Sequence, residues 1–195
     1  MNMSRVSLVV AVLLLPQCLS AKSPSQALQA LRDAGASMCT SGVAIVMSVG
    51  RDRWTKGNEG LNPLRHRLPK SIGFLNVYPI DQKPLSHIGL AHIANAPDIR
   101  MLRFHTQALA GRSFRQFVEL ANANPKRPRR LVFIRVSITS DSVHWLTQYN
   151  ELEHLHFRSC KLSHANLTLL KQSLPACEIK CHHPLDDSPA KNKNR

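Results

Sequence analysis

The sequence predicts an α/β protein in which short strands and helices alternate along a solenoid of about four turns. A pattern of apolar residues repeats from Ile72 onward, and its last two copies are 24 residues apart. Within each unit, apolar positions that alternate as in a strand precede apolar positions with helical spacing. The apolar residues are mainly Leu, Ile, Val and Ala, and only 5% of the chain is aromatic. These features predict stacked units with one layered aliphatic core, because a single unit cannot bury its apolar face alone.

The third and fourth units are the most regular and define the alignment. Their matching positions are apolar except for one proline in the third unit. In the third unit the positions are Pro128, Leu131, Phe133, Val136, Ile138, Val143 and Leu146, and in the fourth they are Leu152, Leu155, Phe157, Cys160, Leu162, Leu167 and Leu170.

The first two units follow the same pattern with longer connections. The second has an insertion of about five residues near 122–130, and the first has a connection about three residues longer around 79–84. Their pattern positions are Ile72, Leu75, Val77, Leu85, Leu90 and Ile93 in the first unit, and Ile99, Leu102, Phe104, Gln107, Leu109, Phe114 and Phe117 in the second.

A helix and a strand are expected before the repeats. Ser23 is a good N-cap, Pro24 suits the first helical position, and Gly35 ends the helix. The apolar run 43–49 predicts a buried strand. Residues 50–71 combine basic residues with Gly and Pro, which predicts an irregular basic connection. Residues 22–71 are therefore expected to form an N-terminal cap with this connection.

The fourth unit also carries a recognisable motif. The pattern L-x-x-L-x-L-x-x-N/C-x-L is matched by Leu152, Leu155, Phe157, Cys160 and Leu162, and residues 174–179 follow L-P-x-C-x-I. In both features the chain resembles short exported bacterial leucine-rich-repeat proteins. The resemblance implies that residues 72–181 form a solenoid with parallel strands on a concave face and helices on a convex face. The chain departs from the family at the buried asparagine position, which holds Cys160, Val136 and Gln107.

The two ends of the chain are expected to lie outside this fold. Arg5 precedes the apolar run 6–15, and small residues follow, which predicts a signal peptide over 1–21 and a secreted, periplasmic or cell-envelope protein. A lipoprotein anchor at Cys18 and a mitochondrial presequence are alternatives. Pro16 and Gln17 argue against the first, and the single Arg5 argues against the second. The apolar run is too short to predict a transmembrane span, and the polar residues 182–195 predict a disordered tail.

The formal net charge of +14 is compatible with contact with anionic polysaccharide, lipid headgroups or nucleic acid, and the alternative is that it serves only solubility or a weak attraction to any polyanion. The densest basic run is a candidate anion-binding site, with a solvated loop as the alternative. No aromatic residues interleave it, so specific nucleic-acid binding is not expected. The residues of this site are Lys126, Arg127, Arg129 and Arg130.

Outward-facing strand positions form the candidate partner-binding surface. Arginine and aromatic residues, which often anchor interfaces, occur among them. An ordinary solvated sheet face is the alternative. The twelve positions are Phe74, Asn76, Tyr78, Met101, Arg103, His105, Arg130, Val132, Ile134, His154, His156 and Arg158.

Sequence motifs for catalysis are missing, since the chain has no Gly-rich phosphate loop, G-x-S-x-G or H-E-x-x-H. We therefore expect neither an enzyme nor a cofactor. No metal site is expected: His154 and His156 have no evident acidic partner, and their basic neighbours should lower their imidazole pKa values. The cluster Cys177, Cys181, His182 and His183 is expected to form a C-terminal cap, and the pairing of Cys39, Cys160, Cys177 and Cys181 stays open.

The sequence thus favours a non-catalytic protein-binding or scaffold module outside the cytoplasm, acting through the concave face. The alternative is a basic protein that binds polyanions or the cell envelope. Salt dependence distinguishes the two, because charge-driven binding weakens steeply as salt rises.

Overall fold

The computed structural model describes residues 23–41, 44–50, 54–66, 68–96, 99–106, 109 and 112–182. The predicted signal peptide over 1–21 lies outside the described residues. The same holds for residues 183–195 of the predicted tail. His182, where that tail was expected to begin, is instead the last residue of a strand.

The N-terminal helix α1 (Pro24–Asp33) forms where it was predicted. The Ser23 hydroxyl accepts a hydrogen bond from the Gln26 N–H, and the Gln26 side chain accepts one from the Ser23 N–H. This reciprocal cap satisfies two backbone donors that the first turn of a helix leaves free. Ala27 and Leu31 on its inner face are buried.

Strand β2 (Ala44–Val49) is also present as predicted, but alternate residues of it are buried rather than the whole run. Strand β1 (Ser37–Ser41), which was not predicted, pairs with it in antiparallel orientation. Its sequence, SMCTS, has no apolar alternation. It becomes a strand because it pairs with the edge of β2, a contact that local sequence does not reveal.

The basic segment 50–71 is more ordered than expected. Most of its middle forms a 3₁₀ helix, η1 (Gly57–Arg65), in which Leu61 and Leu64 are fully buried. The Trp54 indole N–H donates a hydrogen bond of 2.6 Å to the Gly57 carbonyl and helps to fix the start of this helix. Burial of two leucines therefore overrides the Gly, Pro and Arg content that predicted irregular chain.

From residue 71 onward, strands and helices alternate without exception through the described residues. The elements are β3 (Ser71–Val77), α2 (His87–Ala94), β4 (Ile99–His105), α3 (Arg112–Asn122), β5 (Arg130–Ile134), α4 (Ser140–Thr147), β6 (His154–Arg158), α5 (His164–Ser173) and β7 (Glu178–His182). Strand β7 is the second strand that the sequence analysis missed.

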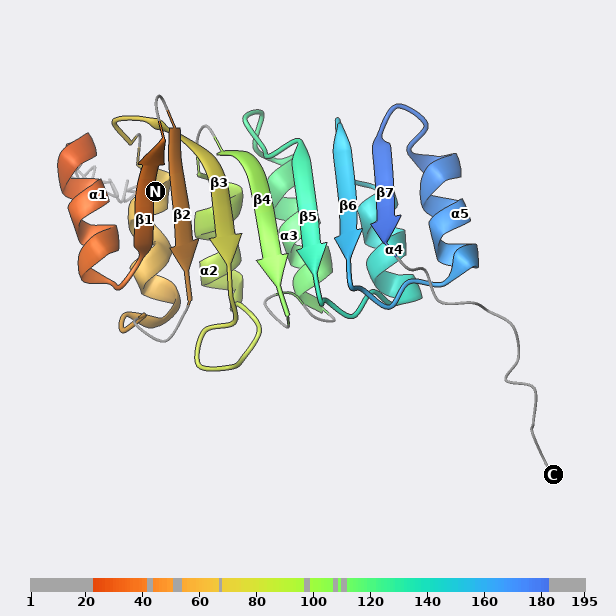
Figure 1. The fold of residues 1–195 in the computed structure, drawn as a ribbon, viewed down its shortest axis with the longest axis horizontal. Coiled ribbons are helices and arrows are strands. Elements are labelled where there is room, and N and C mark those ends of the chain that lie inside the picture. Colours follow the sequence, from red (N-terminus) through yellow and green to blue (C-terminus); the bar gives the residue numbers. More distant parts are fainter. Residues whose placement is uncertain are drawn as a thin grey trace, which may run out of the picture.

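The seven strands form one sheet in the order of the chain, β1-β2-β3-β4-β5-β6-β7. Only the β1–β2 pair is antiparallel. Helices α2, α3 and α4 lie against one face of this sheet, with α1 and α5 at its two ends (Figure 1). Consecutive strand order with crossovers of one hand places every connecting helix on the same side. The predicted α/β class is confirmed, and none of the described helices covers the opposite face of the sheet.

Similar caps begin three of these helices. Ser86, Thr139 and Ser163 each accept a hydrogen bond from the backbone N–H three residues further on. Hydroxyl N-caps of this kind stabilise a helix by about 1 kcal/mol each. The same residue type at the same place in three units fixes where each chain segment turns from the strand into the helix.

A stack of phenylalanines runs through the centre of the core. Phe104, Phe133 and Phe157 occupy matching register positions on β4, β5 and β6. Their ring centroids lie 5.8 and 5.6 Å apart, and all three side chains are fully buried. Phe117 of α3 meets Phe104 edge-on at 5.0 Å. The core therefore has an aromatic centre, although the low aromatic content predicted aliphatic layers.

The position that holds asparagine in the resembled family is occupied in the fourth unit by buried Cys160. Its thiol donates a hydrogen bond of 3.3 Å to the carbonyl of Phe133 on the neighbouring unit. In the third unit the same position is occupied by buried Val136. Its side chain can make apolar contacts but cannot donate a hydrogen bond to the neighbouring unit. Gln107 of the second unit lies outside the described residues.

We predict that Phe133→Ala lowers the free energy of unfolding by about 3–5 kcal/mol, because it removes the central ring of the stack and leaves a cavity. Urea denaturation followed by circular dichroism measures this loss. The neighbouring Ile134→Ala, on the opposite face of the strand, is the control and should cost about 1 kcal/mol. Equal losses in the two variants would contradict the central role of the ring stack.

Candidate binding face

The twelve predicted outward residues all lie on the sheet face that carries no helices, which we call the open face. Strand register arranges them in three columns that run across the sheet. From the amino to the carboxyl ends of the strands, the columns are Phe74, Met101, Arg130 and His154; Asn76, Arg103, Val132 and His156; and Tyr78, His105, Ile134 and Arg158.

Strand β7 extends each column by one residue that the sequence analysis did not include. Glu178, Lys180 and His182 continue the first, second and third columns, respectively. The signal was present, because a step of about 24 residues from Leu155 and Phe157 reaches Ile179 and Cys181. Both of those residues pack against the core.

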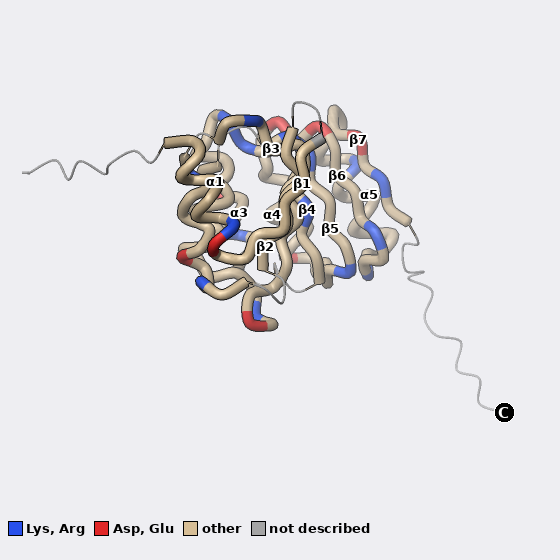
Figure 2. The backbone as a smooth tube through the Cα atoms, turned by 60° about the vertical axis from the view of Figure 1, so that its left-hand side comes forward, with Lys and Arg blue, Asp and Glu red and all other residues tan. Residues whose placement is uncertain are grey.

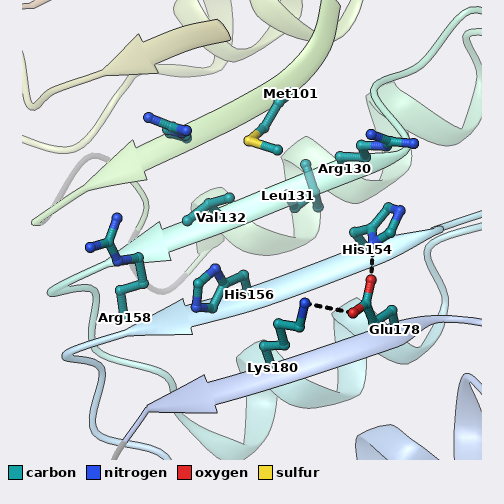
Figure 3. Close-up of a pocket in the computed structure, with 10 residues that line it drawn as sticks. Met101, Arg130, Leu131, Val132, His154, His156, Arg158, Glu178 and Lys180 are labelled. Carbon is teal, nitrogen blue, oxygen red and sulfur yellow. Dashed lines mark ion pairs between the residues drawn. The ribbon is translucent and has the colours of Figure 1, made fainter.

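The first column is rich in ion pairs. His154 Nδ1 lies 2.6 Å from a Glu178 carboxylate oxygen, and Lys180 Nζ lies 2.6 Å from the other oxygen. The expectation that His154 lacks an acidic partner was therefore wrong, because the partner comes from the unpredicted strand β7. Figure 3 shows Glu178 between these two basic groups. Hydrogen bonds from Lys180 and then from His154 lower the pKa of Glu178.

Aromatic and basic side chains pack against one another within and between the columns. The Arg103 guanidinium lies 4.4 Å from the centre of the Phe74 ring. The Tyr78 and His105 rings stack at 4.1 Å, and His105 Nε2 lies 3.5 Å from the Asn76 amide oxygen. These contacts hold long side chains in place, which reduces the entropy that a partner must remove on binding.

His156 is the least satisfied polar side chain of the open face. Its Nε2 is shielded from solvent and has no hydrogen-bond partner among the described residues. Such an atom costs the fold about 1–3 kcal/mol. Burial lowers the pKa of His156, and the positive charges of His182, Arg158, Lys180 and Arg103 lower it further. The predicted effect of basic neighbours is confirmed for this histidine.

A hollow of about 450 Å³ lies on the open face over β4 to β7. Its volume is within the range of sites for small ligands, of roughly 300–1,000 Å³. Val132, on β5, lies between longer side chains from the strands on either side (Figure 3). The residues around the hollow are Met101, Arg103, Arg130, Leu131, Val132, His154, His156, Arg158, Glu178 and Lys180.

A second hollow of about 420 Å³ lies at the carboxyl ends of the strands and shares Arg158 with the first. Thr106, Arg135 and Ser159 line its rim, and each directly follows one of the strands β4, β5 and β6. All three adopt left-handed backbone conformations, with φ of 50°, 56° and 53°. The chain therefore leaves the sheet with the same sharp turn in three successive units, so that β4, β5 and β6 end at matching positions along this edge of the sheet.

The basic run at 126–130 lies beside the fold's own carboxylates. Arg127 and Arg129 approach Glu151 at 3.2 and 2.9 Å, and Arg129 and Arg130 approach Glu153 at 3.4 and 3.5 Å. Arg127 is nearly buried and also donates to the carbonyls of Asn124 and Asn150. Three of the four predicted anion-binding residues, all except the exposed Lys126, thus have internal partners that offset their charge.

Three of the four residues of the C-terminal cluster, Cys177, Cys181 and His182, are described, and Cys181 and His182 belong to strand β7. The pairing that the sequence left open is absent among the described residues, where Cys39, Cys160, Cys177 and Cys181 are all free thiols in this structure. Burial raises the pKa of Cys177 to about 11, which keeps its thiol protonated at neutral pH. No group of three His, Cys, Asp or Glu residues within the described ranges could hold a metal ion. His183 lies outside those ranges.

The chain matches no family model, no curated protein and no solved structure. Among the helices that the structure describes, none has the length and apolar character needed to cross a membrane. Conclusions about function therefore rest on the geometry of the chain itself.

We predict that Lys180→Met raises the pKa of Glu178, because it removes the largest cause of the lowered value. Carboxyl carbon resonances followed by NMR during an acid titration measure this shift. The Glu178 pKa is lowered by folding, so its stabilising effect is present at neutral pH and disappears as the pH falls through the lowered value. Lys171→Met, on helix α5, is the control and should leave the Glu178 titration unchanged.

We also predict that His182→Ala raises the pKa of His156, because it removes the strongest of the neighbouring charges. The His156 ring proton titration, recorded by NMR, tests this. In the unmodified protein the lowered pKa means that the free energy of unfolding decreases as the pH falls from about 6.5 through the folded-state value. An unchanged His156 titration in the variant would show that the charge of His182 does not contribute to the lowered pKa.

Proposed function

We propose that this chain is a non-catalytic binding protein of the leucine-rich-repeat type, which recognises a protein partner through the open face. The repeated strand–helix unit, consecutive strand order and helices on a single side support this class. The hydrogen bond from Cys160 at the asparagine position adds a second point of likeness to the repeat motif. The proposed location outside the cytoplasm rests on the signal-like segment 1–21.

One observation carries the proposal: four consecutive strands, with Tyr78 directly after the first of them, carry the twelve outward side chains on a sheet face that none of the described helices covers. Repeat proteins of this architecture bind partners through their continuous sheet surface. The surface combines aromatic and arginine side chains, which are enriched among residues that dominate binding energy. Several are already held by stacking, as in the Tyr78–His105 and Arg103–Phe74 pairs. This is the preorganisation that a recognition surface needs.

A second candidate is a protein that binds polyanions or the cell envelope. Basic residues outnumber acidic ones along the chain (Figure 2), with 26 Lys and Arg against 12 Asp and Glu. However, the densest basic run lies against Glu151 and Glu153. The open face also alternates basic with apolar and aromatic residues instead of forming a continuous basic track. These features favour a protein partner over an extended polymer.

We predict that the triple variant His154→Ala, His156→Ala, Arg158→Ala loses its partner in a pull-down from an envelope extract at both low and moderate salt. Loss of about tenfold or more in retained partner is expected if these residues anchor the interface. The matched control replaces His87, His164 and Arg112 by alanine. These residues begin helices α2, α5 and α3 and change the charge by the same amount.

Retention of the partner by the control and its loss from the open-face variant would support the proposal. A partner that both variants retain, and that salt releases, would instead support charge-driven polyanion binding, because such binding weakens steeply between low and moderate salt. That result would rule out the open face as the recognition surface.

A further inference from the structure

Positive charge is unevenly compensated along the open face. At the amino ends of the strands, Glu178 and Glu153 neutralise His154, Lys180 and Arg130. Toward the carboxyl ends, Arg103 and Arg158 have no carboxylate within 4 Å among the described residues. The charge of Arg158, after the effect of burial, lowers the pKa of Arg103, so the two guanidinium groups are close enough to repel each other.

These arginines and His156 surround one short apolar residue. Val132 lies between Arg103 on β4 and His156 on β6 in the second column, and Arg158 follows two residues after His156. Neighbouring strands are about 4.8 Å apart, so β4 and β6 flank Val132 at a separation of about 10 Å. A carboxylate with a hydrogen bond of about 2.9 Å on each side spans about 8 Å, so side chains that rise from strands at this separation leave room for one carboxylate between them.

We propose that Arg103, His156 and Arg158 form a cradle, with Val132 as its floor, that binds a single side-chain carboxylate of a peptide segment in the protein partner. This inference rests on the proposed function and assigns the chemistry of recognition at the same open face. Two guanidinium groups supply charge-assisted hydrogen bonds with planar geometry, which suits a carboxylate. His156 Nε2, which lacks a partner within the described chain, supplies a third donor. Because this nitrogen is shielded from solvent, the side chains around it, of which Arg158 is exposed, must rotate slightly to admit the carboxylate.

The surroundings of the cradle favour a peptide of mixed character over an extended polyanion. Met101 and Val132 provide apolar contact inside the same hollow. Glu178, at the opposite end of the hollow, would repel a second closely spaced negative group. A single acidic side chain flanked by apolar residues therefore complements the hollow at both ends.

Carboxylate binding should be linked to proton uptake by His156. The charged groups that face this imidazole are Arg103 from β4, Arg158 from its own strand, and Lys180 and His182 from β7. These positive charges oppose protonation of the empty cradle, whereas a bound carboxylate offsets them. Affinity should consequently increase as the pH falls from about 7.5 to 5.5, by at most about tenfold per pH unit for one proton.

The test is an NMR titration of the purified protein with acetyl-leucyl-glutamyl-leucinamide. We expect saturable shifts in the Arg103 and Arg158 Nε–H signals and in the His156 ring signals, and tighter binding at pH 5.5 than at pH 7.5. The uncharged glutaminyl analogue should bind at least tenfold more weakly. A heparin octasaccharide serves as the polyanion probe and should not compete at stoichiometric concentration.

Two variants and one control make the result specific. Arg103→Gln with Arg158→Gln removes the two charges, and Val132→Leu fills the floor while leaving every charge in place. Both should weaken peptide binding by about tenfold or more. Arg32→Gln with Lys171→Gln changes the net charge equally on exposed helical positions and should have no effect. General charge attraction would spare Val132→Leu and affect both double variants alike.

The outcomes separate this inference from the proposed function. Equal binding of the glutamyl and glutaminyl peptides to the open face would overturn the carboxylate cradle and leave the binding face standing. Peptide shifts confined to other surfaces would also overturn the cradle, and the pull-down variants then decide the proposed function independently. Tighter, saturable binding of heparin at Arg103 and Arg158 would overturn it in favour of a polyanion ligand.

Discussion

The in-register stacking of Phe104, Phe133 and Phe157 is the interaction on which the rest of the structure depends. Each ring is buried only because the neighbouring unit supplies the next one, so no unit is stable alone. The stack also fixes the register of β4, β5 and β6. Since a shift of one residue would move every buried side chain to the opposite face, the ring stack strongly constrains the pairing of these strands.

The same register determines the open face. Residues on either side of each buried phenylalanine point away from the core, so a column of buried rings generates two columns of outward side chains. Phe104 is flanked by Arg103 and His105, and Phe133 by Val132 and Ile134. Phe157 is flanked by His156 and Arg158. Core packing and recognition surface are therefore two consequences of one alternating pattern, and a change in the core would displace the surface columns as well.

Electrostatic balance gives the molecule its asymmetry. A chain with a net charge of +14 has few carboxylates, and the fold places several of them where arginines are most crowded. Glu151 and Glu153 accept three arginines, while Glu178 accepts His154 and Lys180. The carboxyl ends of the strands receive no such compensation from the described residues. This contrast, rather than overall charge, distinguishes a site for one anion from a surface that attracts any polyanion.

The sequence by itself determined the α/β class, the start of helix α1, the repeated units and the twelve outward positions, because these follow from local periodicity and capping. Only the tertiary structure decided that β1, η1 and β7 form, since each depends on an edge or a buried surface made by distant residues. The ion-pair partner of His154 was also decided only by the tertiary structure, because Glu178 lies 24 residues away on a strand that was not predicted. Likewise, pairing of the basic run with Glu151 and Glu153 requires neighbouring units to stack. Periodicity fixes which face a residue occupies, whereas the charge opposite it depends on which segments the fold brings together.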